Sequence, residues 1–361
     1  MGSAASYTTV RDRLPPRSSV PRFLSRPIAH VTRAEPRLAP LILESLRVPP
    51  AVVMGDGLPP LFLELLGPDV EVVPWTTEPS SDDARRIVAL ITYGHPRVDG
   101  PLLDRFPNLK VVTNHGVGVD HIDVAACAAR RIPVGNTPGC LDASTADMTF
   151  ALLLAVARNV VVGDHFARGP EFTHYDPAMW IGSEVSGSTL GIVGLGRIGR
   201  QVAQRARGFD MRILYHNRHR DTAAERELGV VWCSLDDLLA QGDFVSLHCP
   251  LTPQTTGLIG EPQLRKMKPS AFLINMARGP VVQTEALLVA LRERWIAGAG
   301  LDVTDPEPLP RNHPLLGLDN LVIAPHLGSA SNRTRRRMIE MSIENLWAGL
   351  TTGQLSWSVQ P

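Results

Sequence analysis

Residues 189–200 read Thr-Leu-Gly-Ile-Val-Gly-Leu-Gly-Arg-Ile-Gly-Arg, so an apolar strand pattern runs through glycines into a helical pattern. In a dinucleotide-binding fold, Gly194 would make the tight turn, Gly196 would let the backbone approach the pyrophosphate, and Gly199 would let the helix pack against the strand. The N-terminus of that helix would offer free N–H groups to the phosphates. A single glycine motif is weak evidence, so the interpretation depends on the rest of the chain.

Short apolar segments alternate with helical patterns in two series, which is typical of parallel α/β folds. The predicted strands are 51–54, 70–73, 87–92 and 109–113 in the first series and 190–193, 211–215, 244–248, 271–275, 298–302 and 321–324 in the second. We therefore expect an α/β protein of two Rossmann-like, doubly wound parallel-sheet domains with a cleft between them.

The chain of 361 residues is longer than one hydrophobic core usually spans, which also favours two domains. We expect residues 147–330 to form the NAD(P)-binding Rossmann domain. Residues 49–146, completed by 331–361, would form the substrate-binding domain. An apolar helix capped by Ser144 or Thr145 would connect the two.

The first 48 residues differ from the rest because they are rich in arginine and poor in acids, with scattered serine and proline. This composition predicts a disordered leader. Arginine-rich, acid-poor N-termini are also found in mitochondrial transit peptides, but the prolines oppose an amphipathic helix. We therefore expect a cytosolic protein and keep mitochondrial import as the alternative.

Composition narrows the classes of partner. Lysine plus arginine equals aspartate plus glutamate at 36 each, which argues against nucleic acid and anionic membrane as partners. The longest apolar run, residues 150–157, is too short to span a bilayer. The four cysteines show no metal-ligand spacing, so we expect no metal. The balanced charge leaves a small-molecule ligand as the expected partner.

The second strand of the dinucleotide fold usually ends in an acid that binds the ribose hydroxyls. Here residues 213–215 run into a segment without a carboxylate at the strand tip. Asn217 could hydrogen-bond a 2′-phosphate and Arg218 or Arg220 could neutralise it, which favours NADP(H) over NAD(H). The alternatives are a solvated arginine loop or a ribose contact from Asp221.

Three segments that follow strands of the second series each carry one polar side chain suited to reducing a 2-oxo acid. His326 would protonate the carbonyl oxygen during hydride transfer, and Glu307 would keep it charged near neutrality. Arg278 would orient the substrate and stabilise the developing negative charge. Asp302 would contact the coenzyme, support Arg278 or cap its strand.

Residues 114–120 follow a strand of the first series and contain two glycines. Their backbone N–H groups would form an anion-binding nest for a substrate carboxylate, with a simple strand-to-helix turn as the alternative.

These motifs occur in the order found in the D-isomer-specific 2-hydroxyacid dehydrogenases, which the chain resembles from about Pro50 to its C-terminus. The resemblance is carried by residues 116–120, 194–199, 275–279, 300–303 with 306–308, and 325–329. Within the family, residues 302–310, 312–316 and 326–330 are most similar to glyoxylate and hydroxypyruvate reductases.

The resemblance implies a homodimer and a substrate site made by Val117, Gly118, Arg278 and His326, with Arg278, Glu307 and His326 as catalytic residues. It has two departures: no counterpart of the leader, and Pro250 where many relatives use another residue against the nicotinamide ribose. The expected coenzyme contacts are Gly194, Gly196, Arg197, Ile198, Gly199, Asn217, Arg218, Arg220, Pro250, Met276, Asp302 and Gly328.

We therefore expect an NADPH-preferring reductase that converts glyoxylate to glycolate and hydroxypyruvate to D-glycerate. Reduction of 2-ketogluconate is an alternative within the same chemistry. A non-catalytic, NAD(P)H-sensing protein similar to the co-repressors of this fold is the alternative from another class.

Overall fold

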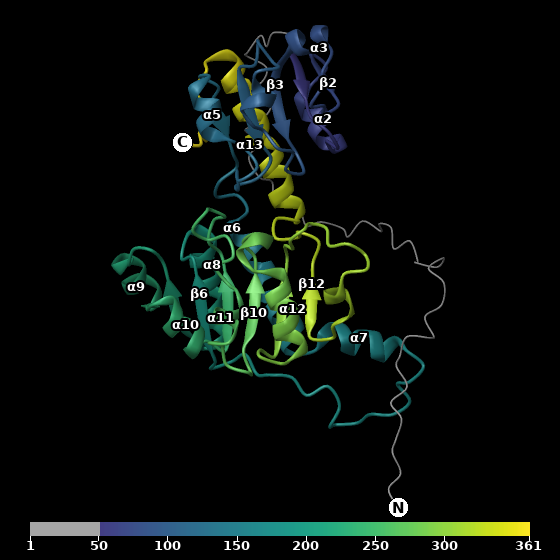
Figure 1. Ribbon diagram of the computed structural model, residues 1–361, viewed down its shortest axis with the longest axis vertical. Coiled ribbons are helices and arrows are strands. Elements are labelled where there is room, and N and C mark those ends of the chain that lie inside the picture. Colours follow the sequence, from purple (N-terminus) through teal and green to yellow (C-terminus); the bar gives the residue numbers. More distant parts are fainter. Residues whose placement is uncertain (1–50) are drawn as a thin grey trace, which may run out of the picture. The chain divides into compact units, whose positions relative to one another are not determined.

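The computed structural model describes residues 51–361, which fold around two parallel sheets (Figure 1). The predicted leader, residues 1–48, lies outside the described residues. Both sheets fall within one compact unit of the chain. The α/β class and the two parallel sheets expected from the sequence are thereby confirmed.

The first sheet has five strands in the order β2-β1-β3-β4-β5, all parallel. Pairing of Thr92 with Asn114 aligns the carboxyl ends of β3 and β4, so the loops that follow them lie at one edge. The strands are β1 (Ala51–Met54), β2 (Val70–Val73), β3 (Ile87–Thr92), β4 (Val111–Asn114) and β5 (Val134–Gly135), and the helices are α2 (Pro60–Leu66), α3 (Ser81–Arg86), α4 (Gly100–Leu103) and α5 (Val124–Ala129).

The second sheet has seven parallel strands in the order β12-β11-β10-β9-β6-β7-β8, and the chain order reverses beside β6. Such a switch point is where open α/β sheets bind ligands. The strands are β6 (Thr189–Val193), β7 (Arg212–His216), β8 (Val231–Trp232), β9 (Phe244–Leu247), β10 (Phe272–Asn275), β11 (Gly298–Leu301) and β12 (Leu321–Ile323). The helices are α8 (Arg197–Ala206), η2 (Arg207–Phe209), α9 (Thr222–Leu228), α10 (Leu235–Gln241), α11 (Glu261–Leu264), η3 (Gly279–Val281), α12 (Thr284–Arg292) and η4 (Pro314–Gly317).

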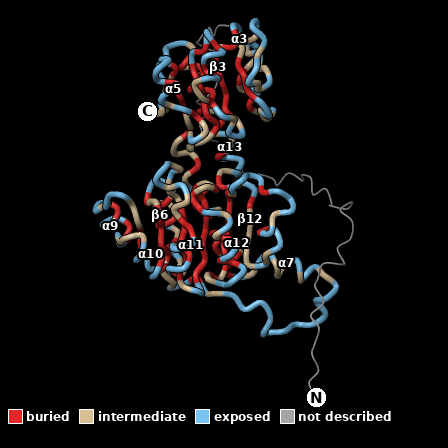
Figure 2. The backbone as a smooth tube through the Cα atoms, in the orientation of Figure 1, coloured by how far each residue is buried: buried red, intermediate tan, exposed pale blue. Residues whose placement is uncertain are grey.

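Helices cover both faces of each sheet because the strands are apolar on both sides, as Figure 2 shows by their burial. On the second sheet, α10, α11 and α12 pack on one face and α8 and α9 on the other. On the first sheet, α4 and α5 cover one face and α2 the opposite face.

Two long helices connect the sheets in sequence. Helix α6 (Asp142–Ala157) follows the first sheet and buries Phe150 and Leu153 in the core of the second. Helix α13 (Asn332–Thr351) follows the second sheet and packs Ile343 and Leu346 on the first, beside β3 in Figure 1. The chain therefore passes from one sheet to the other and back.

The predicted cap of α6 is wrong. The helix begins at Asp142, with Leu141 in the capping position and no side-chain cap. Ser144 lies inside the first turn instead and donates its hydroxyl to the carbonyl oxygen of Gly328 at 2.9 Å. A serine near the start of an apolar helix therefore serves here as a contact to the second sheet's last loop.

Among residues 51–361, no single helix is both long and apolar enough to cross a membrane. The bent pair of α6 and α7 (Val160–Arg168), 62° apart, passes that test on length and composition alone.

Candidate active site

The glycine loop between β6 and α8 has the geometry that a dinucleotide requires. Gly194 has φ 100°, and a Cβ there would lie 2.6 Å from the backbone nitrogen of Cys249. A Cβ on Gly199 would lie 2.3 Å from the carbonyl oxygen of Gly194, whereas nothing lies within 4 Å of one on Gly196. The loop is thus tight where the chain turns and open where a phosphate would approach.

The N-terminus of α8 has no side-chain cap, because Gly196 occupies the capping position. Its first N–H groups therefore point outward with the positive end of the helix dipole, as pyrophosphate binding requires. At this end the exposed Arg197 forms an ion pair with Asp142 of α6 at 2.8 Å, and Ile198 packs on the core. The residues present fit a bound dinucleotide.

The tip of β7 is held against the glycine loop by Asn217. Its Oδ1 accepts a hydrogen bond from the backbone N–H of Leu195 at 2.7 Å, and its backbone oxygen accepts one from the indole N–H of Trp232 at 3.3 Å. This use of Oδ1 leaves the side-chain NH₂ as the donor that can meet a phosphate.

The two arginines that follow differ in their contacts. Arg220 forms a two-bond pair with Glu225 at 2.7 and 2.8 Å, whereas Arg218 is exposed and has no ion pair within residues 51–361. Asp221 caps α9 by accepting from the N–H of Ala224 at 2.9 Å and also pairs with Arg200. Its carboxylate therefore already bonds to two protein groups, and the alternative that it contacts the ribose stays a prediction.

Arg278, after β10, lies against the loop that follows β4. Its Nε donates to Asp120 Oδ1 at 3.0 Å, and its Nη1 donates to the carbonyl oxygen of Ala277 at 2.9 Å. A Cβ on Gly118 would lie 1.8 Å from Nη2, so the guanidinium occupies the space that a side chain at Gly118 would need. Burial alone would raise the pKa of Asp120, but the charge and hydrogen bond of Arg278, together with a backbone N–H and the charge of His121, lower that pKa overall.

The loop after β4 is shaped by two asparagines. The side-chain amide of Asn114 donates to the carbonyl oxygens of Gly116 at 3.0 Å and Gly118 at 2.9 Å. Asn136 donates to the carbonyl oxygen of Val117 at 2.9 Å. These bonds take up the carbonyl groups, and within the described residues the N–H groups of Val117 and Gly118 donate to no protein acceptor.

His326 and Glu307 meet although they come from different loops. Their Nδ1 and Oε1 atoms lie 2.8 Å apart, which leaves Nε2 of the half-buried His326 as the second ring nitrogen. Burial alone would raise the pKa of Glu307, but the hydrogen bond and charge of His326 outweigh it and lower that pKa. The pair is therefore a carboxylate and an imidazole in direct contact.

Asp302 positions the segment that carries His326. Its two oxygens accept from the N–H groups of Leu327 at 2.6 Å and Gly328 at 2.8 Å, and burial raises its pKa. A Cβ on Gly328 would lie 2.9 Å from Asp302 Oδ2 and 3.4 Å from the methyl group of the buried Met276. These three residues pack together, whereas Pro250 is exposed and its carbonyl oxygen accepts from Thr255 at 2.6 Å.

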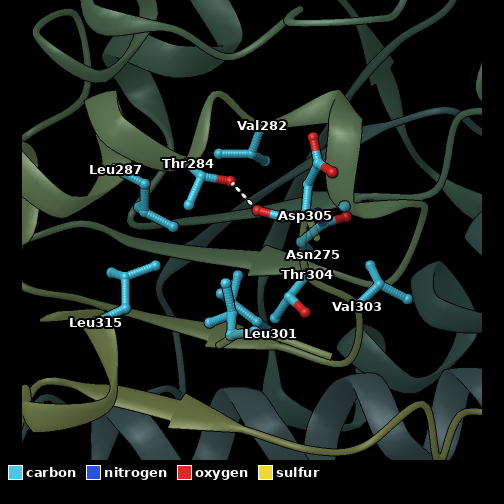
Figure 3. A pocket seen from close by; sticks show the side chains of 11 residues that line it. Asn275, Val282, Thr284, Leu287, Leu301, Val303, Thr304, Asp305 and Leu315 are labelled. Carbon is cyan, nitrogen blue, oxygen red and sulfur yellow. Dashed lines mark hydrogen bonds between the residues drawn. The ribbon is translucent and has the colours of Figure 1, made fainter. Parts of the chain in front are cut away.

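A small hollow is lined in part by Thr304 and Asp305, which belong to the loop that carries Glu307 (Figure 3). It has room for about one water molecule. Thr284 points across it and donates its hydroxyl to the carbonyl oxygen of Asp305 at 2.8 Å. A Cβ on Gly279 would lie 1.9 Å from the carbonyl oxygen of Thr304, so the loops of Arg278 and Glu307 touch at this glycine.

The structure thus brings Arg278, Glu307 and His326 to adjacent loops and places the predicted phosphate contacts around α8 and β7. Sequence reasoning missed Asn114, Asp120 and His95, whose ring centroid lies 5.4 Å from that of His326. Asn114 and Asp120 stand within the glycine-containing stretch that was singled out, so their polar side chains were a usable signal. For His95 the only signal was a histidine shortly after a predicted strand.

Comparison with known proteins shows matches over most of the described residues. The family profile for D-isomer specific 2-hydroxyacid dehydrogenase, NAD binding domain, matches residues 150–328. Glyoxylate reductase of Korarchaeum cryptofilum is 51% identical over 267 residues, 74% of this chain and 80% of that protein. Glyoxylate reductase of Aeropyrum pernix is 46% identical over 309 residues, 83% of this chain and 92% of that protein.

A solved structure has the same fold. The NADPH-dependent glyoxylate/hydroxypyruvate reductase of Sinorhizobium meliloti, in complex with NADP and malonate, is 32% identical with a TM-score of 0.78, covering 86% of this chain and 96% of that one. With the glycine loop and the strand-end residues in place, these similarities establish that the chain belongs to the D-isomer specific 2-hydroxyacid dehydrogenase family of oxidoreductases.

Proposed function

We propose that this protein is a reductase of small 2-oxo acids that prefers NADPH and converts glyoxylate to glycolate and hydroxypyruvate to D-glycerate. The observation that carries the proposal is the contact between Glu307 and His326 at 2.8 Å, with Arg278 on the adjoining loop. The activities named for the relatives agree with this assignment.

In this proposal one domain binds the coenzyme and the other binds the substrate. Residues 147–330 bind the coenzyme, and residues 49–146 with 331–361 form the substrate side. The coenzyme, when bound, supplies the hydride that reduces the carbonyl carbon. Gly194, Gly196 and the N-terminus of α8 would hold its pyrophosphate.

Substrate binding falls to Arg278 and the loop after β4. The guanidinium presents planar donors that can polarise the substrate carbonyl and bind the adjacent carboxylate. The unpaired N–H groups of Val117 and Gly118 would bind that carboxylate as well. Because these groups come from both sides of the site, they fix the orientation of the carbonyl relative to the hydride donor.

Proton delivery falls to His326. As hydride reaches the carbonyl carbon, Nε2 of the imidazolium donates its proton to the carbonyl oxygen, which completes the 2-hydroxy acid. Glu307 holds Nδ1, fixes the ring orientation and stabilises its positive charge. Asp302 would position His326 indirectly, because it accepts hydrogen bonds from two backbone N–H groups in the turn that follows His326.

Preference for NADPH rests on the loop after β7, where there is no carboxylate at the strand tip. Arg218 is exposed and uncommitted within the described residues, and Asn217 keeps its NH₂ available. Both are suited to a 2′-phosphate, and Arg220 can add to the local positive potential although it is paired with Glu225.

We also propose that the protein is a homodimer. Helix α7 and the segment after it expose an unusual number of large apolar side chains, as protein interfaces do. These side chains are Val160, Val161, Phe172, Tyr175, Met179, Trp180 and Ile181.

Replacement of Arg278 tests the reaction assignment. We expect Arg278→Ala to lower kcat/KM for glyoxylate by about 10²- to 10³-fold, because it removes the donors that stabilise the transition state. Coenzyme affinity, measured by NADPH fluorescence titration, should stay within about threefold of wild type. Near-normal turnover of glyoxylate by Arg278→Ala would refute the proposal.

A further inference from the structure

His95 lies on the loop that follows β3, at the same edge of the first sheet as the loop that follows β4. Gly94 and His95 have φ values of 81° and 62°, so two successive residues are left-handed. This backbone region is uncommon for a residue with a side chain, and Pro96 follows at once. The backbone at His95 therefore sets the direction in which its side chain leaves the loop.

That direction is toward the proposed proton donor. The His95 ring lies 5.4 Å from the His326 ring, with 34° between their planes. On its other side it meets His121 edge-on, at 5.0 Å between centroids. Both ring nitrogens of His121 are buried without a hydrogen-bond partner, so His121 holds the His95 ring by packing alone.

The charged groups that act on His95 are residues of the candidate active site. Partial removal of the ring from water lowers its pKa, and the positive charges of Arg278 and His326 lower it further, against the opposing effects of Asp120 and Glu307. His95 is therefore a neutral imidazole near pH 7. A neutral ring has one N–H donor and one acceptor nitrogen.

Neither ring nitrogen of His95 makes a hydrogen bond to any residue in 51–361, and the residue is exposed. By contrast, His216 and His313 each bond to a protein group through a ring nitrogen. His95 therefore presents an unused donor and an unused acceptor beside the proposed catalytic groups.

We propose that His95 binds the substituent carried by the substrate's carbonyl carbon and selects 2-oxo acids with a hydroxyl on the next carbon. The inference rests on the proposed function, in which Arg278 and the β4 loop take the carboxylate and His326 takes the carbonyl oxygen. In this arrangement the remaining substituent of the carbonyl carbon faces His95, which lies beside His326 and within reach of the Arg278 charge. A hydroxyl can bond to either ring nitrogen, whereas a methyl group can bond to neither.

Three substrates of graded structure test this inference: glyoxylate with hydrogen at that position, pyruvate with methyl and hydroxypyruvate with hydroxymethyl. The quantity measured is kcat/KM for each with wild type, His95→Phe and His95→Gln. His95→Phe keeps a ring without polar atoms and should lower the hydroxypyruvate-to-pyruvate ratio about tenfold. His95→Gln restores a donor and an acceptor and should keep the ratio within about threefold of wild type.

Arg97→Gln is the matched control, since Arg97 is on the same loop and its side chain is 83% exposed. It should leave all three constants unchanged. An unchanged ratio in His95→Phe, or a parallel loss for all three substrates, would overturn the assignment. Absence of glyoxylate turnover in wild type would instead refute the proposed function.

Discussion

At the scale of single residues, the proposed site depends on positions where a side chain is absent as well as on the side chains that we propose act in the reaction. The guanidinium of Arg278 fills the space beside Gly118, and its Nε is held by Asp120. Any side chain at Gly118 would displace the group that we propose binds the substrate. A Cβ on Gly116, two residues earlier, would meet only the Asn114 amide, at 3.4 Å.

Substitution of these two glycines distinguishes a specific packing effect from general damage to the loop. Gly118→Ala should lower kcat/KM for glyoxylate by at least about tenfold, because Arg278 has to move from its present position. Gly116→Ala should change it less than about threefold. Steady-state kinetics with both variants measure this, and equal losses in the two would contradict the role given to Arg278.

Glu307 gives a prediction for pH dependence. Its pKa is lowered in the folded protein, so its contribution to stability is present above the unfolded-state value and is lost as the pH falls through the lowered one. Near neutrality the carboxylate is charged and bonds to His326 Nδ1. In Glu307→Gln this contribution is absent, so the thermal unfolding midpoint should vary less than that of wild type as the pH falls from about 7 to about 3.

The measurements are the thermal unfolding midpoint from about pH 3 to about pH 7 and kcat for glyoxylate reduction near pH 7. Glu307→Gln should also lower kcat near pH 7 by about 10- to 100-fold. Glu261→Gln, on the exposed start of α11, serves as the control. A kcat of Glu307→Gln equal to that of wild type would contradict the role given to Glu307 beside His326.

The three residues that we propose as catalytic are predictable from sequence because each follows a strand whose apolar pattern is visible. Their partners are not, since Asp120 and Arg278 are 158 positions apart and meet only once both sheets are formed. His95 is missed for the same reason. Nothing in the residues around position 95 shows that its ring reaches His326.

At the scale of elements, the predicted strands of four or more residues have counterparts in both sheets. Long parallel strands are buried on both faces and therefore appear as continuous apolar runs. The prediction missed β5 and β8, which have two residues each. Two residues cannot display either an apolar run or an alternation, and only pairing with β4 and β7 defines them.

The loop after β7 carries the prediction for coenzyme preference. Arg218→Ala should lower kcat/KM for NADPH about tenfold or more and leave that for NADH within about twofold, because only NADPH has a 2′-phosphate to bind. Arg226→Ala, an exposed arginine on the neighbouring α9, should change neither. Equal effects of Arg218→Ala on kcat/KM for both coenzymes would show that Arg218 does not bind the 2′-phosphate and is a solvated surface residue.

At the scale of the whole molecule, α7 and residues 170–181 leave apolar side chains uncovered. Tyr175 is 81% exposed and Ile181 is 78% exposed, far more than apolar side chains in a core. Burial of such a surface against a second copy would stabilise a dimer in proportion to the apolar area removed from water.

Light scattering coupled to gel filtration measures the assembly. Wild type should have twice the mass of the chain, and Ile181→Glu should shift the protein toward monomer, because the interface would have to bury a charge. Leu63→Glu, at an exposed leucine of α2, is the matched control and should leave the mass unchanged. A monomeric wild type would contradict the proposed homodimer.

The central claim is that this protein reduces small 2-oxo acids with a nicotinamide coenzyme. The most direct test is the initial rate of absorbance loss at the reduced-nicotinamide band, with glyoxylate, hydroxypyruvate and 2-ketogluconate, and with NADPH and NADH in parallel. We predict turnover of the two short acids, faster with NADPH than with NADH. Binding of either coenzyme without turnover of any acid would contradict the claim and favour a dinucleotide-sensing protein.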